Sequence, residues 1–163
     1  MRIFVLVVFL LFRFGVANCQ NNHTIETTDI DRFWIAFDEL KSATNKSDSL
    51  TIIQTNYIDK SSNFFKEFIR VRNLKADEYL YVISKYPKFW EPIRFETLKI
   101  KDRKNEIVAI FDNYEKEIPN FKRPNVCFAI GCLRTGGTVS ENLILIGTEI
   151  AASTPDSHKT ELT

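Results

Sequence analysis

Histidine and glycine are scarce in this chain of 163 residues, and each shortage excludes a class of function. The two histidines, His23 and His158, are far apart, so the zinc-binding motif His-Glu-x-x-His is missing. Five glycines and five prolines argue against a repeat or low-complexity protein. A formal net charge of +1 gives no indication of the basic face that nucleic acid requires. We therefore expect no nucleic-acid partner, and no metal or cofactor held by these residues.

Cysteine is too rare for a disulfide framework. Cys19 lies near the N-terminus, and Cys127 and Cys132 fall five positions apart in one predicted strand. At a rise of ~3.3 Å per residue their Cα atoms would be about 16 Å apart, whereas a disulfide needs less than about 7 Å. A zinc knuckle requires a different spacing and a second pair of ligands. We interpret Cys127 and Cys132 as structural thiols.

The N-terminal apolar run is too short to span a membrane. Arg2 is followed by ten apolar residues, 3–12, whereas a spanning helix needs about 20. This pattern predicts a signal peptide over 1–19 with cleavage before Gln20, and hence an exported, periplasmic or secreted protein without a stable membrane span. Two alternatives are a lipoprotein acylated at Cys19 and a short N-terminal membrane anchor.

The first half of the chain has the periodicity of amphipathic helices. Apolar residues recur at i, i+3, i+4 and i+7, and we interpret these stripes as core. Helices are predicted near 30–40, 50–58, 63–71, 75–85 and 105–117. The aromatic segment 86–92 reads as a turn or irregular segment, and 94–104 is open between strand and helix.

Two strand-like runs follow, 125–133 and 142–151, on either side of a glycine-containing turn. We expect them to pair as an antiparallel hairpin, with a positive φ at Gly136 or Gly137. The segment 131–138 differs from a phosphate-binding loop because Gly137 stands in place of the lysine and a strand follows in place of a helix. The predicted fold class is α+β, with a helix-rich part followed by a β-hairpin.

The domain boundaries follow from the same patterns. Residues 20–28 and the tail 152–163 are polar and predicted to be disordered. One α+β domain is predicted over 29–151. Its second strand carries large apolar residues on both faces, which is typical of a strand buried on two sides.

The segment 125–150 contains Gly-Cys-Leu-Arg-Thr-Gly-Gly-Thr at 131–138 and Ile-Gly-Thr-Glu at 146–149. These two pieces resemble a family of predicted zinc-dependent proteases, the DUF2268 type, which is related to the GldB group of gliding-motility lipoproteins. The resemblance extends over about 31–150. It implies an exported, zincin-like protein whose zinc ligands and catalytic glutamate lie on a later helix that carries His-Glu-x-x-His.

None of those catalytic or metal-binding residues has a counterpart in this chain, so no catalytic and no metal residue is assigned. The expectation is an incomplete zincin-like domain, a truncated and inactive N-terminal portion of such a protein, with zinc expected only in a full-length relative. A His-Glu-x-x-His sequence encoded downstream of Thr163 would support this interpretation.

By analogy with zincins, the second strand would lie near the cleft and pair with a protein or peptide substrate by β-augmentation. The substrate-strand candidates are Leu143, Ile144, Leu145, Ile146 and Gly147. The alternative is a stand-alone secreted protein-binding module that uses the edge of the hairpin. We also expect a weakly stable chain that associates through the Ile144 and Ile146 face.

Overall fold

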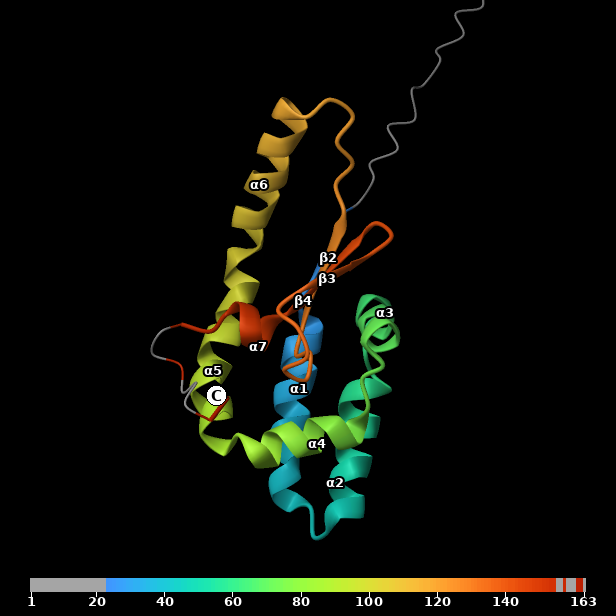
Figure 1. The fold of residues 1–163 in the computed structure, drawn as a ribbon, viewed down its shortest axis with the longest axis vertical. Coiled ribbons are helices and arrows are strands. Elements are labelled where there is room, and N and C mark those ends of the chain that lie inside the picture. The colour runs from blue at the N-terminus through green and yellow to red at the C-terminus, as the bar shows by residue number, and fades with distance from the viewer. Residues whose placement is uncertain (1–22, 155–156, 158–160, 163) are drawn as a thin grey trace, which may run out of the picture.

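The structure is a computed structural model that describes residues 23–154, 157, 161 and 162. Helices dominate, and a small mixed sheet lies among them, which confirms the predicted α+β class (Figure 1). The predicted signal peptide, 1–19, lies outside the described residues. The helices are α1 (Thr28–Glu39), η1 (Leu40–Ser42), α2 (Lys46–Ile53), η2 (Gln54–Ile58), α3 (Asn63–Arg72), α4 (Ala76–Lys85), α5 (Pro87–Lys99), η3 (Ile100–Arg103), α6 (Lys104–Glu117) and α7 (Thr148–Ala151). The strands are β1 (Ile25–Glu26), β2 (Asn125–Ala129), β3 (Thr138–Ser140) and β4 (Leu143–Gly147).

The sheet has the order β1-β2-β4-β3, and its two apolar strands are parallel. The expected antiparallel pairing of 125–133 with 142–151 is therefore wrong. The chain leaves β2, passes through a loop and forms the short strand β3, which pairs antiparallel with β4 at the sheet edge. The hairpin is thus β3–β4, and it turns at Glu141, whose φ is 46°. Residues 138–140, which fall within the predicted glycine-containing turn, are therefore a strand.

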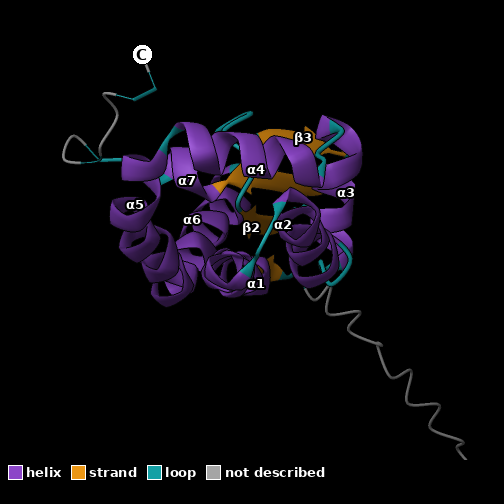
Figure 2. Cartoon of the chain, turned by 90° about the horizontal axis from the view of Figure 1, so that it is seen from below, coloured by secondary structure: helices purple, strands orange, loops and turns teal. Residues whose placement is uncertain are grey.

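The inner face of the sheet packs on an aromatic core. Alternation along β2 and β4 directs Cys127, Ala129, Leu143 and Leu145 to this face, and all four are buried. Seen from below, helices α1, α2 and α4 lie in front of the strands (Figure 2). The largest fully buried side chains come from α1, η2, α3, α4 and α5: Phe33, Trp34, Tyr57, Phe65, Phe68, Tyr79, Phe89 and Trp90.

Residues 87–92 are helical, which corrects the expected turn or irregular segment. Pro87 occupies the first position of α5, where its missing N–H costs nothing, and Pro92 lies inside the helix. Phe89, Trp90 and Ile93 are all fully buried. Burial of these side chains outweighs the hydrogen bond that Pro92 cannot make.

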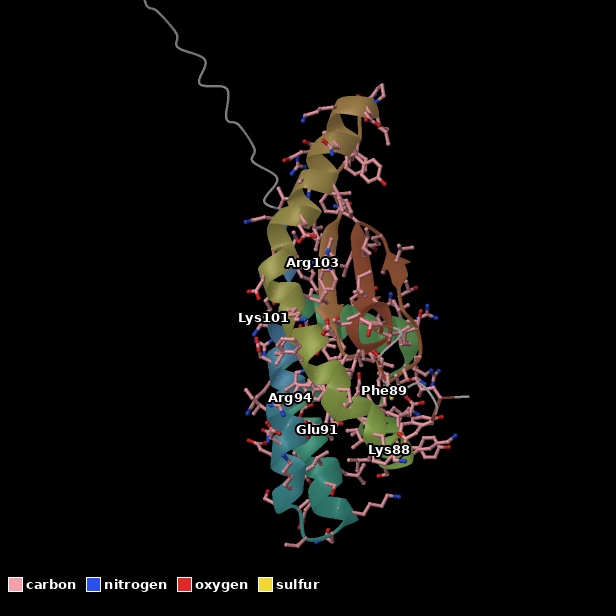
Figure 3. The ribbon with its side chains drawn as sticks, turned by 90° about the vertical axis from the view of Figure 1, so that its left-hand side faces the viewer. Lys88, Phe89, Glu91, Arg94, Lys101 and Arg103 are labelled. Carbon is pink, nitrogen blue, oxygen red and sulfur yellow. The ribbon has the colours of Figure 1, made fainter. Side chains whose placement is uncertain are left out.

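Helices α5, η3 and α6 form one long column beside the sheet (Figure 1). Two ion pairs attach this column to α1. The Arg94 guanidinium donates to both carboxylate oxygens of Asp38 at 2.8 and 2.6 Å, and Lys101 Nζ lies 2.7 Å from Asp31 Oδ1. Figure 3 shows Arg94 and Lys101 on the side of the column.

The N-terminal segment 20–28 is expected to be disordered, but its described part, 23–28, has regular contacts with the fold. Ile25 and Glu26 form β1, which pairs in parallel with β2, and Thr27 is buried. At the start of α1, the buried Asp29 carboxylate accepts hydrogen bonds from the Ser62 amide at 2.9 Å and from Arg32 at 2.7 Å. Asp29 therefore ties α1 to the N-cap of α3.

The predicted disordered tail also has contacts in its described residues. Ser153 Oγ donates to the Glu149 carbonyl at 2.9 Å, and the Lys88 amide donates to Glu161 at 2.9 Å. Among the described residues, no helix is long and apolar enough to cross a membrane.

Candidate functional site

The loop 130–137, which leads from β2 to the edge strand β3, is held from inside the protein. Two buried tyrosines from different helices meet at its first residue. The hydroxyls of Tyr57 and Tyr79 donate to the Ile130 carbonyl at 2.8 and 2.7 Å, and the Ile130 amide donates to the Tyr57 hydroxyl at 3.0 Å. Burial raises the pKa of both phenols well above their usual value, so both hydroxyls keep their protons.

A buried carboxylate holds the next residues of the loop. The Gly131 amide donates to Glu149 Oε1 at 3.0 Å and to Oε2 at 2.9 Å, and the Leu133 amide donates to Oε1 at 2.8 Å. Glu149 is fully buried, and burial raises its pKa to about 7 although these amide donors act in the opposite direction. The two pieces of the family resemblance, 131–138 and 146–149, are thus in direct contact.

Gly147 allows the backbone of the loop to lie close to the end of β4. A Cβ built on Gly147 would lie 2.0 Å from the Thr135 carbonyl oxygen, so only glycine allows the loop to pass here. The expected positive φ at Gly136 or Gly137 is wrong, because no described glycine has a positive φ. Cys132 and Leu133 have it instead, with φ of 60° and 55°. This left-handed pair directs the Gly131 and Leu133 amides toward Glu149.

The substrate-strand candidates Leu143, Ile144, Leu145, Ile146 and Gly147 form β4, and β4 is an interior strand. It pairs with β2 on one side and with β3 on the other. The expectation that this strand offers its edge to a substrate is therefore wrong. Among the described strands the edges belong to β1 and β3. The middle residue of β3, Val139, is 71% exposed.

A polar pocket of about 460 Å³ opens beside the end of β3. On the sheet side, Asn125, Leu143 and Ser140 are neighbours across β2, β4 and β3. On the helix side, α3 presents Glu67 and Arg70. The remaining lining residues are Phe64, Glu141 and Asn142.

Glu67 joins the two walls of this pocket. Its carboxylate accepts a hydrogen bond from Ser140 Oγ and from the Arg70 guanidinium, with Arg70 Nη2 at 2.6 Å. These hydrogen bonds lower the pKa of Glu67 to about 2. The Glu67 side chain is 27% exposed, whereas that of Arg70 is 71% exposed. Glu67 is therefore held by both walls of the pocket, whereas Arg70 is held through Glu67 and is open to solvent.

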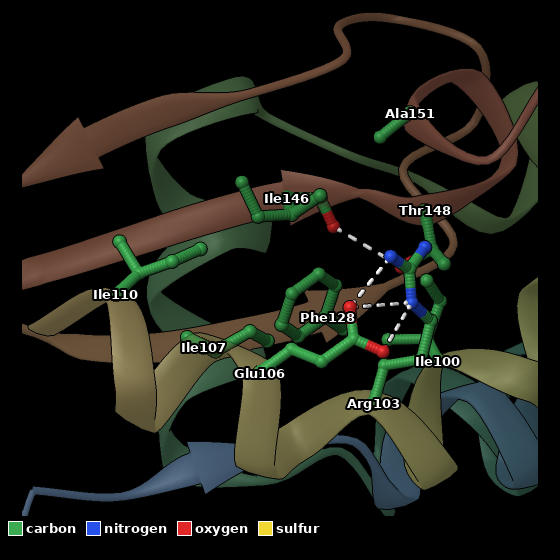
Figure 4. Close-up of a pocket in the computed structure, with 9 residues that line it drawn as sticks. All are labelled: Ile100, Arg103, Glu106, Ile107, Ile110, Phe128, Ile146, Thr148 and Ala151. Atoms are coloured by element: carbon green, nitrogen blue, oxygen red, sulfur yellow. Dashed lines mark hydrogen bonds and ion pairs between the residues drawn. The ribbon is translucent and has the colours of Figure 1, made fainter.

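An apolar groove of about 320 Å³ lies on the opposite, outer face of the sheet (Figure 4). Phe128 and Ile146 form its sheet wall, and Ile107 and Ile110 of α6 form the other. The lining also includes Ile100, Thr148 and Ala151, with the Arg103–Glu106 ion pair at one end. Ile110 is 51% exposed, so α6 covers this face only in part.

The described residues hold no cluster of three or more histidine, cysteine or acidic side chains that could bind a metal ion. Cys127 and Cys132 are buried free thiols. Burial raises the pKa of both thiols far above their usual value, so neither is a reactive thiolate.

Comparison of the chain with protein-family models, with curated proteins and with solved structures finds no match. The site is therefore interpreted from its own geometry. Sequence reasoning missed two parts of it, the role of Glu149 and the edge position of β3. The sequence signal for Glu149 is an acidic residue two positions after the end of the apolar strand β4. A charge that is buried together with such a strand costs free energy unless it is hydrogen-bonded.

Proposed function

We propose that this protein is the substrate-side scaffold of an exported zinc-metalloprotease-like protein, and that it holds an extended peptide against β3. One observation carries the proposal: β3 is an edge strand, antiparallel to its neighbour, and no described strand pairs with its outer side. The unpaired N–H and C=O groups of such an edge can pair with another extended chain. The proposal moves the peptide from β4, where the resemblance suggests it, to the adjacent strand.

The fixed position of β3 supports this function. Glu149, Tyr57 and Tyr79 hold the start of the loop that leads into β3. Within that loop, the Gly137 amide donates to Thr135 Oγ1 at 3.1 Å. A strand that is ordered before binding loses less conformational entropy when a peptide pairs with it.

The proposal assigns peptide holding, and no bond cleavage, to these residues. The sequence contains no His-Glu-x-x-His, so the zinc site of the resembled family has no ligands here. The edge strand and the loop that positions it do not depend on that site.

Alternately N-methylated peptides test the pairing. In a β-ladder, every second residue of the added strand directs its N–H to the neighbouring strand. We expect an extended peptide with N-methyl groups at one alternate set of residues to lose binding, and the peptide methylated at the other set to retain it. Fluorescence anisotropy of labelled peptides measures both. Equal binding of the two methylated peptides would show that the backbone edge is not used.

The alternative function is a stand-alone secreted protein-binding module. Three exposed apolar side chains favour it: Ile110, which lines the apolar groove, Tyr114 on the same helix and Ile118 just beyond it. Exposed apolar side chains of this kind suit a protein partner. Sequencing of transcripts past the codon for Thr163 separates the two. A downstream His-Glu-x-x-His supports the protease-like protein, and its absence in every frame supports the binding module.

A further inference from the structure

We infer that the polar pocket beside Ser140 is a specificity subsite that accepts a basic side chain, lysine or arginine, of the peptide paired with β3. This inference rests on the proposed function, because the bound strand is what would place a side chain there. Three observations carry it: the position of the pocket along the sheet, the fixed carboxylate of Glu67 and the charge of the pocket walls.

The position follows from the register of the sheet. Asn125, Leu143 and Ser140 are partners across three strands and point to the same inner face, toward α3. Side chains directly opposite each other on paired strands share a face. The residue of an added strand that lies opposite Ser140 therefore continues this row and directs its side chain toward Glu67 and Arg70.

The fixed group in the pocket is an acid. Glu67 accepts a hydrogen bond from Ser140 of the edge strand itself, so its carboxylate lies at the point where the added side chain enters. Its partner Arg70 donates to both Glu67 oxygens, from Nε at 2.7 Å and from Nη2 at 2.6 Å, and the Arg70 side chain is 71% exposed. Because water can solvate the exposed guanidinium once it leaves, an incoming cation can replace Arg70 at the carboxylate.

The charge of the walls favours a cation over an anion. Two carboxylates, Glu67 and Glu141, face one guanidinium, Arg70, and both carboxylates raise the pKa of Arg70. The two carboxylates thus stabilise the positive charge of Arg70, and they would stabilise the charge of an incoming lysine or arginine in the same way. A peptide with an acid at this position would meet two like charges and lose affinity.

The neighbouring positions of the peptide are also constrained. Val139 points to the outer face, as does its partner Ile144, so the residue opposite Val139 lies beside an apolar surface. The structure thus assigns a bound peptide that alternates an apolar residue with a basic one.

The test measures the affinity of a set of extended peptides for the protein. The peptides differ only at the residue expected opposite Ser140, which is lysine, norleucine or glutamate. On the unmodified protein we expect the lysine peptide to bind about fivefold tighter than the norleucine peptide, the usual effect of one partly exposed ion pair. Glu67→Gln should abolish this preference. Glu96→Gln is the matched control, because Glu96 pairs with Lys99 at i+3, has a 32% exposed side chain and lies on α5.

A second variant gives a result in the opposite direction. Arg70→Ala frees the Glu67 carboxylate, so it should increase the preference for lysine, and melting curves check that each variant is folded. A lysine preference that persists in Glu67→Gln, a preference for the glutamate peptide, or a loss of preference in Arg70→Ala would overturn the inference while leaving the proposed function intact. If none of the peptides binds, the proposed function fails and the subsite fails with it.

Discussion

At the scale of single residues, the contact between Gly147 and Thr135 fixes how closely the loop approaches the sheet. The Thr135 carbonyl fills the space where any other residue would carry its Cβ. Gly131 is less restrictive, because its Cβ would meet the ring of Phe68 at 3.1 Å, and a side chain can move more easily than backbone.

Replacing Gly147 with alanine tests this contact. The added methyl group would overlap the Thr135 carbonyl oxygen, so we expect Gly147→Ala to destabilise the protein by about 2 kcal/mol or more. Chemical denaturation measures the loss. Gly137→Ala is the control, since its nearest atoms would be at 3.6 Å and we expect little change in stability. Equal stability of the two variants would contradict the close approach.

Glu149 makes the stability of the fold depend on pH. Its pKa is about 7 in the folded protein and near the usual 4.5 in the unfolded chain. Between these values the folded protein binds a proton that the unfolded chain lacks. The contribution of Glu149 is therefore complete below pH 4.5 and is lost as the pH rises through 7. This difference between the folded and unfolded pKa of Glu149 corresponds to about 3 kcal/mol in the free energy of unfolding.

Glu149→Gln should remove most of this pH dependence between pH 5 and pH 8. Asp38 and Glu67 do not contribute in that range, because their pKa values are about 2. Urea denaturation at several pH values gives the slope for each protein, and Glu91→Gln, a change at an exposed glutamate, serves as the control. A slope that is the same in all three proteins would show that Glu149 does not titrate in this range.

At the scale of elements, three segments distant in sequence meet at Ile130. Tyr57 comes from η2, Tyr79 from α4, and Ile130 directly follows β2. The two tyrosines are unequal, because Tyr57 both donates to the Ile130 carbonyl and accepts from its amide, whereas Tyr79 only donates.

We therefore expect Tyr57→Phe to cost more stability than Tyr79→Phe. Loss of the Tyr57 hydroxyl leaves the buried Ile130 amide without an acceptor, which costs about 2 kcal/mol. After loss of the Tyr79 hydroxyl, the Ile130 carbonyl still accepts from Tyr57, so the cost should be roughly half as large. Thermal melting ranks the two. A larger effect of Tyr79→Phe would contradict this assignment.

At the scale of the whole molecule, the two faces of the sheet differ. The inner face packs on the aromatic core, while the outer face, with Ile144 and Ile146, is covered only in part. A partly exposed apolar face of a sheet favours association between molecules.

We expect concentration-dependent self-association that Ile144→Lys or Ile146→Lys reduces, because either change places a charge on the outer face. Analytical ultracentrifugation measures it. Ile35→Lys is the control, since Ile35 is 56% exposed on α1, away from this face. A chain that stays monomeric at high concentration, or an equal effect of the control, would contradict association through the sheet.

The sequence alone determined the local elements. The helical stripes gave α1, α3, α4 and α6 with nearly correct bounds, because the 3.6-residue period of buried side chains is a local pattern. The apolar runs located β2 and β4 but made both strands too long, since 148–151 is helix α7. The absence of His-Glu-x-x-His could be seen in the sequence. Burial of Phe89 and Trp90, which stabilises the helix over 87–92, depends on neighbours that are distant in sequence.

Only the tertiary structure decided how the strands pair and what the candidate site contains. Parallel and antiparallel partners have the same alternation, so the periodicity of β2 and β4 could not reveal their direction, nor that the polar strand β3 takes the edge. The contacts of the Glu149 carboxylate and of the Thr135 carbonyl form only when the loop 130–137 packs against the end of β4. The pocket beside Ser140 forms only when α3 packs against the sheet. These contacts join residues 12 to 73 positions apart, and hydrophobic periodicity carries no information about which groups meet over such separations.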